Sequence, residues 1–307
     1  MANKRIDEAT GTETMGHEWD GIEELNTPLP KWWLYTFYAC IAFAIGYVIV
    51  YPAIPMIHGA TPGIWGWTSR GQLDQEMKKE QAERAPILAA IAKTPLDQLV
   101  TDEKLNRQAI EGGAAAFKVN CVQCHGAGAQ GSVGYPNLND DDWLWGGTID
   151  DIAFTITHGV RQAADPESRM SQMPSFGKDG ILTPDQVGQV VSYVRTISNQ
   201  DKPSASSQAG AAIFAANCAV CHGADGKGSQ AVGAPNLTDG IWLYGGSVAA
   251  LTNTVTNAHY GQMPNWGARL DPVTIKMLAA YVFSRGGGKA AAPAAAPSGT
   301  GTGTPAQ

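Results

Sequence analysis

Two stretches of the chain decide its fold: NCVQCHGAGAQGSVGYPNLNDDDWLWGG at residues 120–147 and NCAVCHGADGKGSQAVGAPNLTDGIWLYGG at residues 217–246. They are two copies of one pattern, and their first cysteines, Cys121 and Cys218, lie 97 positions apart. The copies converge again at SQMPSFG (171–177) and GQMPNWG (261–267). A repeat of this length is large enough to form a small domain, so the sequence predicts two tandem domains of one fold.

Each copy contains Cys-x-x-Cys-His, which is the attachment motif of c-type haem. Two thiols at this spacing reach the two vinyl groups of one macrocycle, and the adjacent histidine supplies a nitrogen to the iron. A redox-active Cys-x-x-Cys does not need the histidine, and a zinc site would need further Cys or His ligands. We therefore predict two covalently bound haem c groups. The predicted residues are Cys121, Cys124 and His125 in the first copy and Cys218, Cys221 and His222 in the second.

The iron of each haem needs a sixth ligand, and Met173 and Met263 occupy matched Gln-Met-Pro contexts. A thioether opposite histidine gives an electron-transfer haem of raised potential. His158 and His259, which precede the two methionines, are alternative ligands, although a structural role fits them better. The sequence leaves open whether each methionine serves its own repeat or the other. Ligation within one repeat is the simpler expectation.

Helices are expected on both sides of each motif. Residues 105–119 and 207–216 lead into the two motifs, and two further helices close the repeats. These closing helices begin at Thr183-Pro184 and Asp271-Pro272, which combine a capping side chain with proline at the first helical position. Their apolar faces are Val187, Val190, Val191 and Val194 in the first and Ile275, Leu278 and Val282 in the second. Sustained period-two alternation is absent from the sequence, so the fold class is mainly α.

Residues 32–51, WWLYTFYACIAFAIGYVIVY, form the most apolar run. These 20 residues carry no formal charge, and about 20 are needed for a helix that crosses a bilayer. Aromatic residues gather at both edges, as in interfacial belts. A buried helix of a soluble domain and a signal peptide are the alternatives, and the run is too long and too far from the N-terminus for the latter. The basic residues before the helix weakly favour a cytoplasmic N-terminus.

Composition excludes several classes of protein. The net charge is -7, which argues against a nucleic-acid binder. Only 16% of residues are charged and 36 are glycine, which argues against a coiled coil or an acidic disordered chain. Five cysteines are an odd number, so a disulfide framework is not expected. Cys40 is left over in the apolar run, where it acts as a small apolar residue.

With these motifs the two repeats resemble class I cytochromes c. The resemblance implies that the prolines of the two Pro-Asn-Leu segments, Pro136 and Pro235, support the haem-binding histidines through their carbonyl groups. It also places Leu138 and Leu237 against the haems. The segment HEWDGIEELNTPLPKWWLYTFY (17–38), followed by one membrane helix and two cytochrome domains, resembles the FixP/CcoP family, which is subunit III of cbb3-type cytochrome c oxidases.

The resemblance implies a dihaem electron-transfer subunit of a bacterial terminal oxidase. Such a subunit takes electrons from a donor cytochrome c and passes them toward the monohaem cytochrome c subunit and the catalytic haem–copper subunit. The chain itself is then not the catalyst of oxygen reduction. The same resemblance implies a single-pass protein of the bacterial inner membrane, with its N-terminus in the cytoplasm and its cytochrome domains in the periplasm.

The resulting domain plan has six parts. They are a cytoplasmic N-terminal segment (1–31), a transmembrane helix (32–51), a partly helical periplasmic linker (52–104), cytochrome c domains 1 (105–200) and 2 (208–286), and a disordered tail (287–307). A free membrane-anchored dihaem shuttle and a dihaem peroxidase are the competing functions. The shuttle does not explain the segment before the membrane helix, and the peroxidase does not explain two intact methionine loops.

Charge is distributed unevenly between the two repeats. Residues 105–200 carry ten acidic and six basic side chains, whereas residues 208–285 carry three and four. Asp140, Asp141, Asp142, Asp150 and Asp151 cluster in the first repeat. One hypothesis is that this face attracts a basic donor cytochrome c. An ordinary solvated loop is the alternative.

Overall fold

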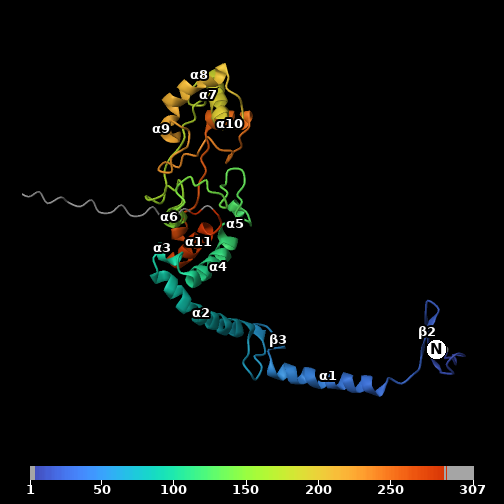
Figure 1. Ribbon diagram of the computed structural model, residues 1–307. Coiled ribbons are helices and arrows are strands. Elements are labelled where there is room, and N and C mark those ends of the chain that lie inside the picture. The colour runs from blue at the N-terminus through green and yellow to red at the C-terminus, as the bar shows by residue number, and fades with distance from the viewer. Residues whose placement is uncertain (1–3, 287, 289–307) are drawn as a thin grey trace, which may run out of the picture. The chain divides into compact units, whose positions relative to one another are not determined.

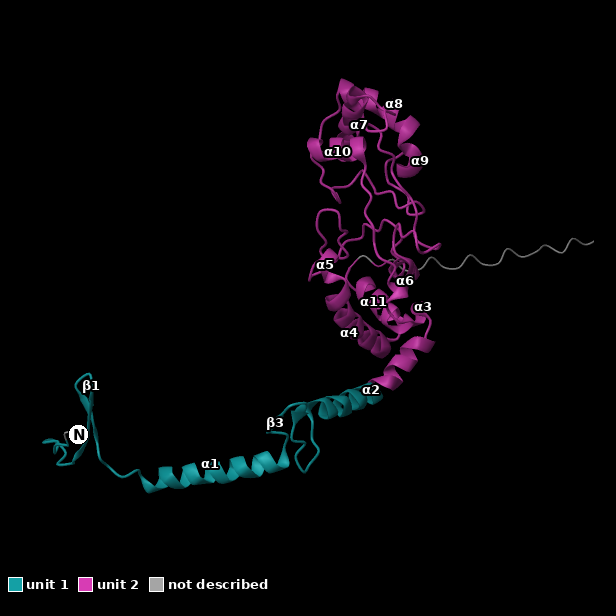
Figure 2. Ribbon diagram, turned by 180° about the vertical axis from the view of Figure 1, so that it is seen from behind, with its two compact units in different colours: residues 1–83 teal, residues 84–307 magenta. Residues whose placement is uncertain are grey.

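The computed structural model describes residues 4–286 and residue 288 of the chain. The chain divides into two compact units, residues 1–83 and 84–307 (Figure 2). The segment expected to be a disordered tail, 287–307, lies outside the described residues except for Gly288. Helix α2 (Ser69–Lys93) begins in the first unit and ends in the second.

The first unit contains the apolar helix α1 (Lys31–Val50), whose 20 residues include none that is buried. At 1.5 Å per residue such a helix is about 30 Å long, which matches the hydrocarbon thickness of a bilayer. Its length and apolar composition suit a membrane span. A hairpin of β1 (Thr14–Trp19) and β2 (Ile22–Leu25) precedes it and turns at Asp20 and Gly21, both with positive φ.

After α1, residues 52–68 fold back onto the end of the helix; we call this segment the return loop. It contains a short antiparallel hairpin of β3 (Pro55–Met56) and β4 (Gly59–Ala60). The amides of Ile64 and Trp65 donate to the carbonyl oxygens of Ile49 and Val50, at 3.1 and 3.3 Å. The last carbonyl groups of a helix have no partner within it, so the return loop satisfies two of them.

The second unit consists of two helical lobes (Figure 1). Lobe A contains α4 (Glu103–Asn120), α5 (Val122–His125), α6 (Ile149–His158), the 3-10 helix η1 (Trp266–Ala268) and α11 (Pro272–Phe283). Lobe B contains α7 (Pro184–Ile197), α8 (Ala205–Asn217), α9 (Ala219–His222) and α10 (Val248–Asn257). The chain therefore leaves lobe A after α6, builds lobe B from one continuous stretch, and returns to lobe A.

The closing helices of the two repeats are exchanged between the lobes. Helix α11, which ends the second repeat, packs along α4 at the start of the first, and α7 packs along α8. The ring of Phe117 lies 5.2 Å from that of Tyr281, and the ring of Phe214 lies 5.1 Å from that of Tyr193. Each closing helix therefore packs on the opening helix of the other repeat, and the expected aromatic contact between an opening and a closing helix is present in both lobes.

Glycine lets the exchanged helices approach closely. A Cβ atom added at Gly113 of α4 would run into the main-chain oxygen of Met277 in α11. In lobe B, a Cβ at Gly210 of α8 would run into the main-chain oxygen of Gln189 in α7. Each lobe therefore has its own helix crossing at a glycine, and both crossings join different repeats.

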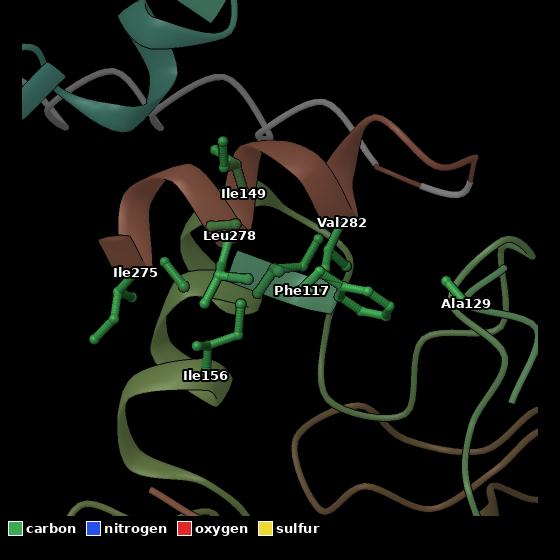
Figure 3. Close-up of a cluster of buried hydrophobic side chains, with 10 residues drawn as sticks. Phe117, Ala129, Ile149, Ile156, Ile275, Leu278 and Val282 are labelled. Atoms are coloured by element: carbon green, nitrogen blue, oxygen red, sulfur yellow. The ribbon is translucent and has the colours of Figure 1, made fainter. Parts of the chain in front are cut away.

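Each lobe has its own hydrophobic core. In lobe A, Leu278 and Val282 of α11 lie beside Phe117 of α4, and Ile156 of α6 closes the cluster (Figure 3). In lobe B the valines of α7 pack around Phe214 of α8. The predicted caps are confirmed: Thr183 forms a capping box with Gln186, and Asp271 accepts from the amides of Val273 and Thr274. The apolar faces predicted for both closing helices are buried.

The end of α2 is fixed to lobe A. Ile91 is fully buried in a small cluster with Leu99 of α3 (Leu96–Leu99), Ala109 of α4 and Ala280 of α11. Lys276 of α11 donates from Nζ to the carbonyl oxygens of Ala92 and Thr94, at 2.9 and 2.8 Å. A lysine that binds carbonyl groups at a helix C-terminus also interacts favourably with the helix dipole.

Candidate haem-binding sites

Both Cys-x-x-Cys-His motifs form a single helical turn directly after an opening helix. Cys121 directly follows α4 as its C-cap, and the amide of His125 donates to the Cys121 carbonyl oxygen at 2.9 Å. In lobe B the amide of His222 donates to Cys218 in the same way, also at 2.9 Å. The turn places the two cysteines and the histidine of each motif on one short element, as attachment of a single macrocycle requires.

The two motif histidines are held by proline carbonyl groups. His125 Nδ1 lies 3.0 Å from the Pro136 oxygen, and His222 Nδ1 lies 3.1 Å from the Pro235 oxygen. Because a carbonyl oxygen can only accept, Nδ1 carries the hydrogen and Nε2 keeps its lone pair. Burial lowers the pKa of both imidazoles. Each motif therefore presents a neutral, oriented imidazole, the form that binds a metal.

The first cysteine of each motif does not have the lowered pKa of a reactive thiol. All five cysteines are free of disulfide bonds. Burial, followed by the neighbouring motif cysteine, raises the pKa of Cys121 and of Cys218 to about 11. Reactive cysteines have lowered pKa values. Within residues 4–286 and 288, no cluster of three or more His, Cys, Asp or Glu side chains could hold a metal ion, so neither motif gains the further ligands of a zinc site.

The two candidate methionines lie in the lobes opposite to their repeats. Met263 packs against the core of lobe A together with Cys121, and Met173 packs against the core of lobe B, which includes Cys218. Main-chain hydrogen bonds fix Met263 to the end of α6: its amide donates to the Val160 oxygen at 3.1 Å and its oxygen accepts from the Val160 amide at 3.0 Å. The structure thus brings Met263 together with the first motif and Met173 with the second.

The loop after Met173 is fixed to lobe B in an equivalent way. The Lys178 amide donates to the Thr256 oxygen at 2.9 Å, and the Ser175 hydroxyl donates to the Asn257 oxygen at 3.0 Å. Phe176 is buried in the core of lobe B. The loop that contains Met173 therefore binds the end of α10, and the loop that contains Met263 binds the end of α6. In both cases the helix belongs to the other repeat.

Of the supporting residues, Leu138 packs against the core of lobe A and Leu237 against that of lobe B. His158 and His259 both have protein partners. His158 Nδ1 lies 3.2 Å from the Asp165 carboxylate. His259 stacks on Tyr244 at 3.7 Å, and its Nε2 lies 3.0 Å from the Thr254 hydroxyl. These contacts support the structural role over iron ligation.

Sequence reasoning did not identify the contacts of Trp145 and Tyr244. A Cβ at Gly233 would overlap the Trp145 ring, and one at Gly134 would lie 3.2 Å from the Tyr244 ring. Each aromatic side chain therefore fits against a glycine that follows the motif of the other repeat. The signal was present in the repeated Trp-Leu-aromatic-Gly-Gly at 143–147 and 242–246.

Arg169 was also missed, because it has no counterpart in the second repeat. Its guanidinium lies 4.7 Å from the Phe154 ring and 5.8 Å from the Trp145 ring, and its Nη2 is 3.3 Å from Asp151. The carboxylate of Asp151 also accepts from the Thr148 hydroxyl at 2.7 Å, at the start of α6. Asp151 therefore has structural partners and is not simply part of a free acidic face.

The comparisons with known proteins cover almost the whole chain. Residues 11–58 match the N-terminal domain of cytochrome oxidase-cbb3, FixP. Residues 110–198 match the cytochrome c family, and residues 205–282 match cytochrome c oxidase, cbb3-type, subunit III.

The curated relatives extend over the same length. The cbb3-type cytochrome c oxidase subunit CcoP of Cereibacter sphaeroides is 54% identical over 276 residues, which is 90% of this chain and 95% of the relative. The subunit FixP of Rhizobium meliloti is 49% identical over 288 residues, or 94% and 99% of the two chains. The FixP subunit of Azorhizobium caulinodans is 50% identical over 287 residues, or 92% and 96%. The chain belongs to the CcoP/FixP family of cbb3-type cytochrome c oxidase subunits, and its two cytochrome c domains make it an electron-transfer subunit of that redox complex.

Proposed function

We propose that the chain carries two covalently attached haem c groups whose iron ligands are shared between the repeats. Cys121 and Cys124 in lobe A, and Cys218 and Cys221 in lobe B, would hold the haem groups through thioether bonds. His125 and Met263 would bind the iron in lobe A, and His222 and Met173 the iron in lobe B. The observation that carries this assignment is the location of each methionine in the core that contains the other repeat's first cysteine.

A bound haem c supplies one-electron redox chemistry, and the chain's own residues prepare the site for it. The carbonyl oxygens of Pro136 and Pro235 hold the Nδ1 hydrogens, so that Nε2 is directed to the metal. A methionine thioether raises the potential relative to a second histidine. The buried aromatic and aliphatic cores keep water away from both sites, which also favours the less charged reduced state.

In this proposal electrons enter from a donor cytochrome c and leave toward the monohaem cytochrome c subunit and the catalytic haem–copper subunit. The chain would be non-catalytic, because His125 and Met263 would hold one iron and His222 and Met173 the other, which leaves oxygen reduction to the haem–copper subunit. Helix α1 crosses the bacterial inner membrane once, with the N-terminal segment (1–31) in the cytoplasm. The linker (52–104) and the repeats (105–200 and 208–286) lie in the periplasm.

The ligand assignment is tested in a chain that holds one haem. Replacing both Cys218 and Cys221 by Ser leaves only the haem attached to the first motif. In this background Met263→His should lower the midpoint potential and remove the methionine-to-iron charge-transfer band of the oxidised protein. Met173→His is the matched control and should leave both unchanged. The reverse pattern would show ligation within one repeat.

The place in the oxidase is tested separately. The full chain, purified from membranes in mild detergent through an affinity tag, should bring down a haem–copper subunit and a monohaem cytochrome c in stoichiometric amounts. A chain recovered alone, with both haems intact, would instead support a free shuttle.

A further inference from the structure

The return loop, residues 52–68, is apolar and exposed although it is not part of the membrane-spanning helix. The exposed fractions are 94% for Ile57, 72% for Ile64 and 67% for Trp65. Ile54 and Met56 are also more than half exposed. Exposed apolar side chains gathered on one short segment mark a contact with a membrane or another molecule.

The uncharged part of the sequence continues well beyond the helix. Asp, Glu, Lys and Arg are absent from Trp32 to Ser69, so the uncharged run includes all of α1 except its first residue, Lys31, and the whole return loop. Charges resume at Arg70, in the first turn of α2, and Asp74, Glu76 and Lys78 follow. The change from apolar to aqueous surroundings is therefore expected at the start of α2 and not at the end of α1.

Backbone contacts fix the position of the return loop along the axis of α1, beside the last turn of that helix. Its Ile64 and Trp65 amides bond to the last turn of α1. Gly63 lies against the Val50 carbonyl group at φ +67, where a side chain would collide with the main chain. Because α1 is as long as the hydrocarbon core is thick, residues bonded to its last turn would lie where the hydrocarbon meets the headgroups when α1 spans a bilayer.

Aromatic rings gather at this same level. Tyr51 stacks on Tyr47 with ring centroids 4.8 Å apart, and the rings of Trp65 and Trp67 lie edge-on to Tyr51 at 5.3 and 5.6 Å. The Trp67 indole nitrogen donates to Gln72 at 2.9 Å, on the side of α2. Tryptophan and tyrosine favour the interface, where the ring is apolar and the polar edge is wet.

We propose that the return loop lies in the headgroup layer of the bilayer and contacts lipid through Ile57, Ile64 and Trp65. The loop thus forms a second, interfacial contact beside the membrane span, and α2 starts at the water-facing side of that layer. The proposal rests on the membrane span proposed for α1. Continuity with α1, in both backbone bonds and absence of charge, is what favours lipid over a protein partner as the occupant.

Spin labels test this depth in the full chain, purified with haem and placed in lipid nanodiscs. In a Cys40→Ala background, labels are attached at Ile57→Cys and, separately, at Ile64→Cys. Ala44→Cys, within α1 and about two turns before its end, and Gln75→Cys on exposed α2 are the two references. Power saturation then compares collisions with oxygen, which dissolves in lipid, and with a water-soluble nickel complex.

Both return-loop labels should collide more with oxygen and less with nickel than the Gln75 label, and should lie shallower than the Ala44 label. Nickel access equal to that of Gln75 would overturn the proposal by placing the loop in water. Low access to both reagents would overturn it by showing that protein covers the loop. The Ala44 label distinguishes failure of the return-loop proposal from failure of the membrane span. High nickel access at Ala44 would show that α1 does not span the membrane.

Discussion

The exchange of closing helices predicts which aromatic pairs are energetically coupled. The rings of Phe117 and Tyr281 are 5.2 Å apart and inclined at 53°, and those of Phe214 and Tyr193 are 5.1 Å apart at the same inclination. Aromatic pairs in this range of distance are worth about 0.5–1.5 kcal/mol beyond the area they bury. Phe117 and Tyr193 belong to different lobes, so their substitutions should be additive to within about 0.5 kcal/mol.

A double-mutant cycle measures this difference. Phe117→Leu, Tyr281→Leu and the double variant are compared in urea unfolding of the haem-loaded full chain in detergent, followed by haem absorbance. The coupling free energy should be about 1 kcal/mol. The same cycle with Phe117→Leu and Tyr193→Leu is the matched control and should give a value close to zero. A coupling of about 1 kcal/mol in the control cycle, with none between Phe117 and Tyr281, would refute the exchanged packing.

Three further predictions concern the contacts of α11. Gly113→Ala should lower the free energy of unfolding of lobe A by about 1–3 kcal/mol, because the added methyl group meets the main chain of Met277. Gly112→Ala is the matched control: its methyl group meets only the flexible Met277 side chain, so the loss measured in the same urea titration should be far smaller. Asp271→Ala, which removes the N-cap of α11, should lower the free energy of unfolding by about 1 kcal/mol at neutral pH, and Asp271→Asn should lower it by less. The Thr274 hydroxyl and the amides at the start of α11 lower the pKa of Asp271. The contribution of this carboxylate to the free energy of unfolding is therefore present above the pKa that Asp271 has in the unfolded chain, and it is lost as the pH falls through the pKa in the folded chain. The stability of the native chain and that of the Ala variant, each measured against pH, should converge in acid and not in alkali. Lys276→Met should speed hydrogen exchange of the backbone amides in the last turn of α2 about tenfold, because three carbonyl groups at this end lose a charged donor. Unchanged exchange rates would mean that apolar packing alone holds this end of the helix.

Much of the site followed from local sequence. The Cys-x-x-Cys-His turns and the caps at Thr183 and Asp271 depend on residues close together in the chain, whereas the contacts of Pro136 and Pro235 were expected from the resemblance to class I cytochromes c. Local patterns of this kind specify local geometry whatever the rest of the fold does.

The partner of each closing helix could not be predicted in this way. The two repeats offer the same features to each other, an aromatic on the opening helix and a tyrosine on the closing one. Phe117 could pack on Tyr193 or on Tyr281 with equal local merit, and Gly113 and Gly210 permit a close crossing in either arrangement. Which opening helix each closing helix packs on is determined by contacts between residues far apart in the chain, such as the hydrogen bonds between Val160 and Met263 and the packing of Trp145 against Gly233.

The acidic cluster shows a second limit of sequence reasoning. Asp140 is partly buried, and burial raises its pKa, while Asp151 binds Thr148 and Arg169. Counting charges along the chain led to the hypothesis that both lie on one donor-binding face, with an ordinary solvated loop as the alternative. Their structural partners, which lie up to 18 positions away, account for part of the cluster without any donor.

The order in which the lobes are threaded has a consequence for how the protein is made. Lobe B is encoded by one continuous stretch, so every helix it needs is present once residue 257 has been synthesised. Lobe A begins earlier but lacks Met263 and α11 until the end of the chain arrives. The first Cys-x-x-Cys-His motif to emerge is therefore the last to be enclosed. While the chain is being made, there is a stage at which the residues around the second motif are all present but Met263 and α11 are still missing from the first. A chain that ended after lobe B would therefore keep the surroundings of the second motif and leave the first motif uncovered.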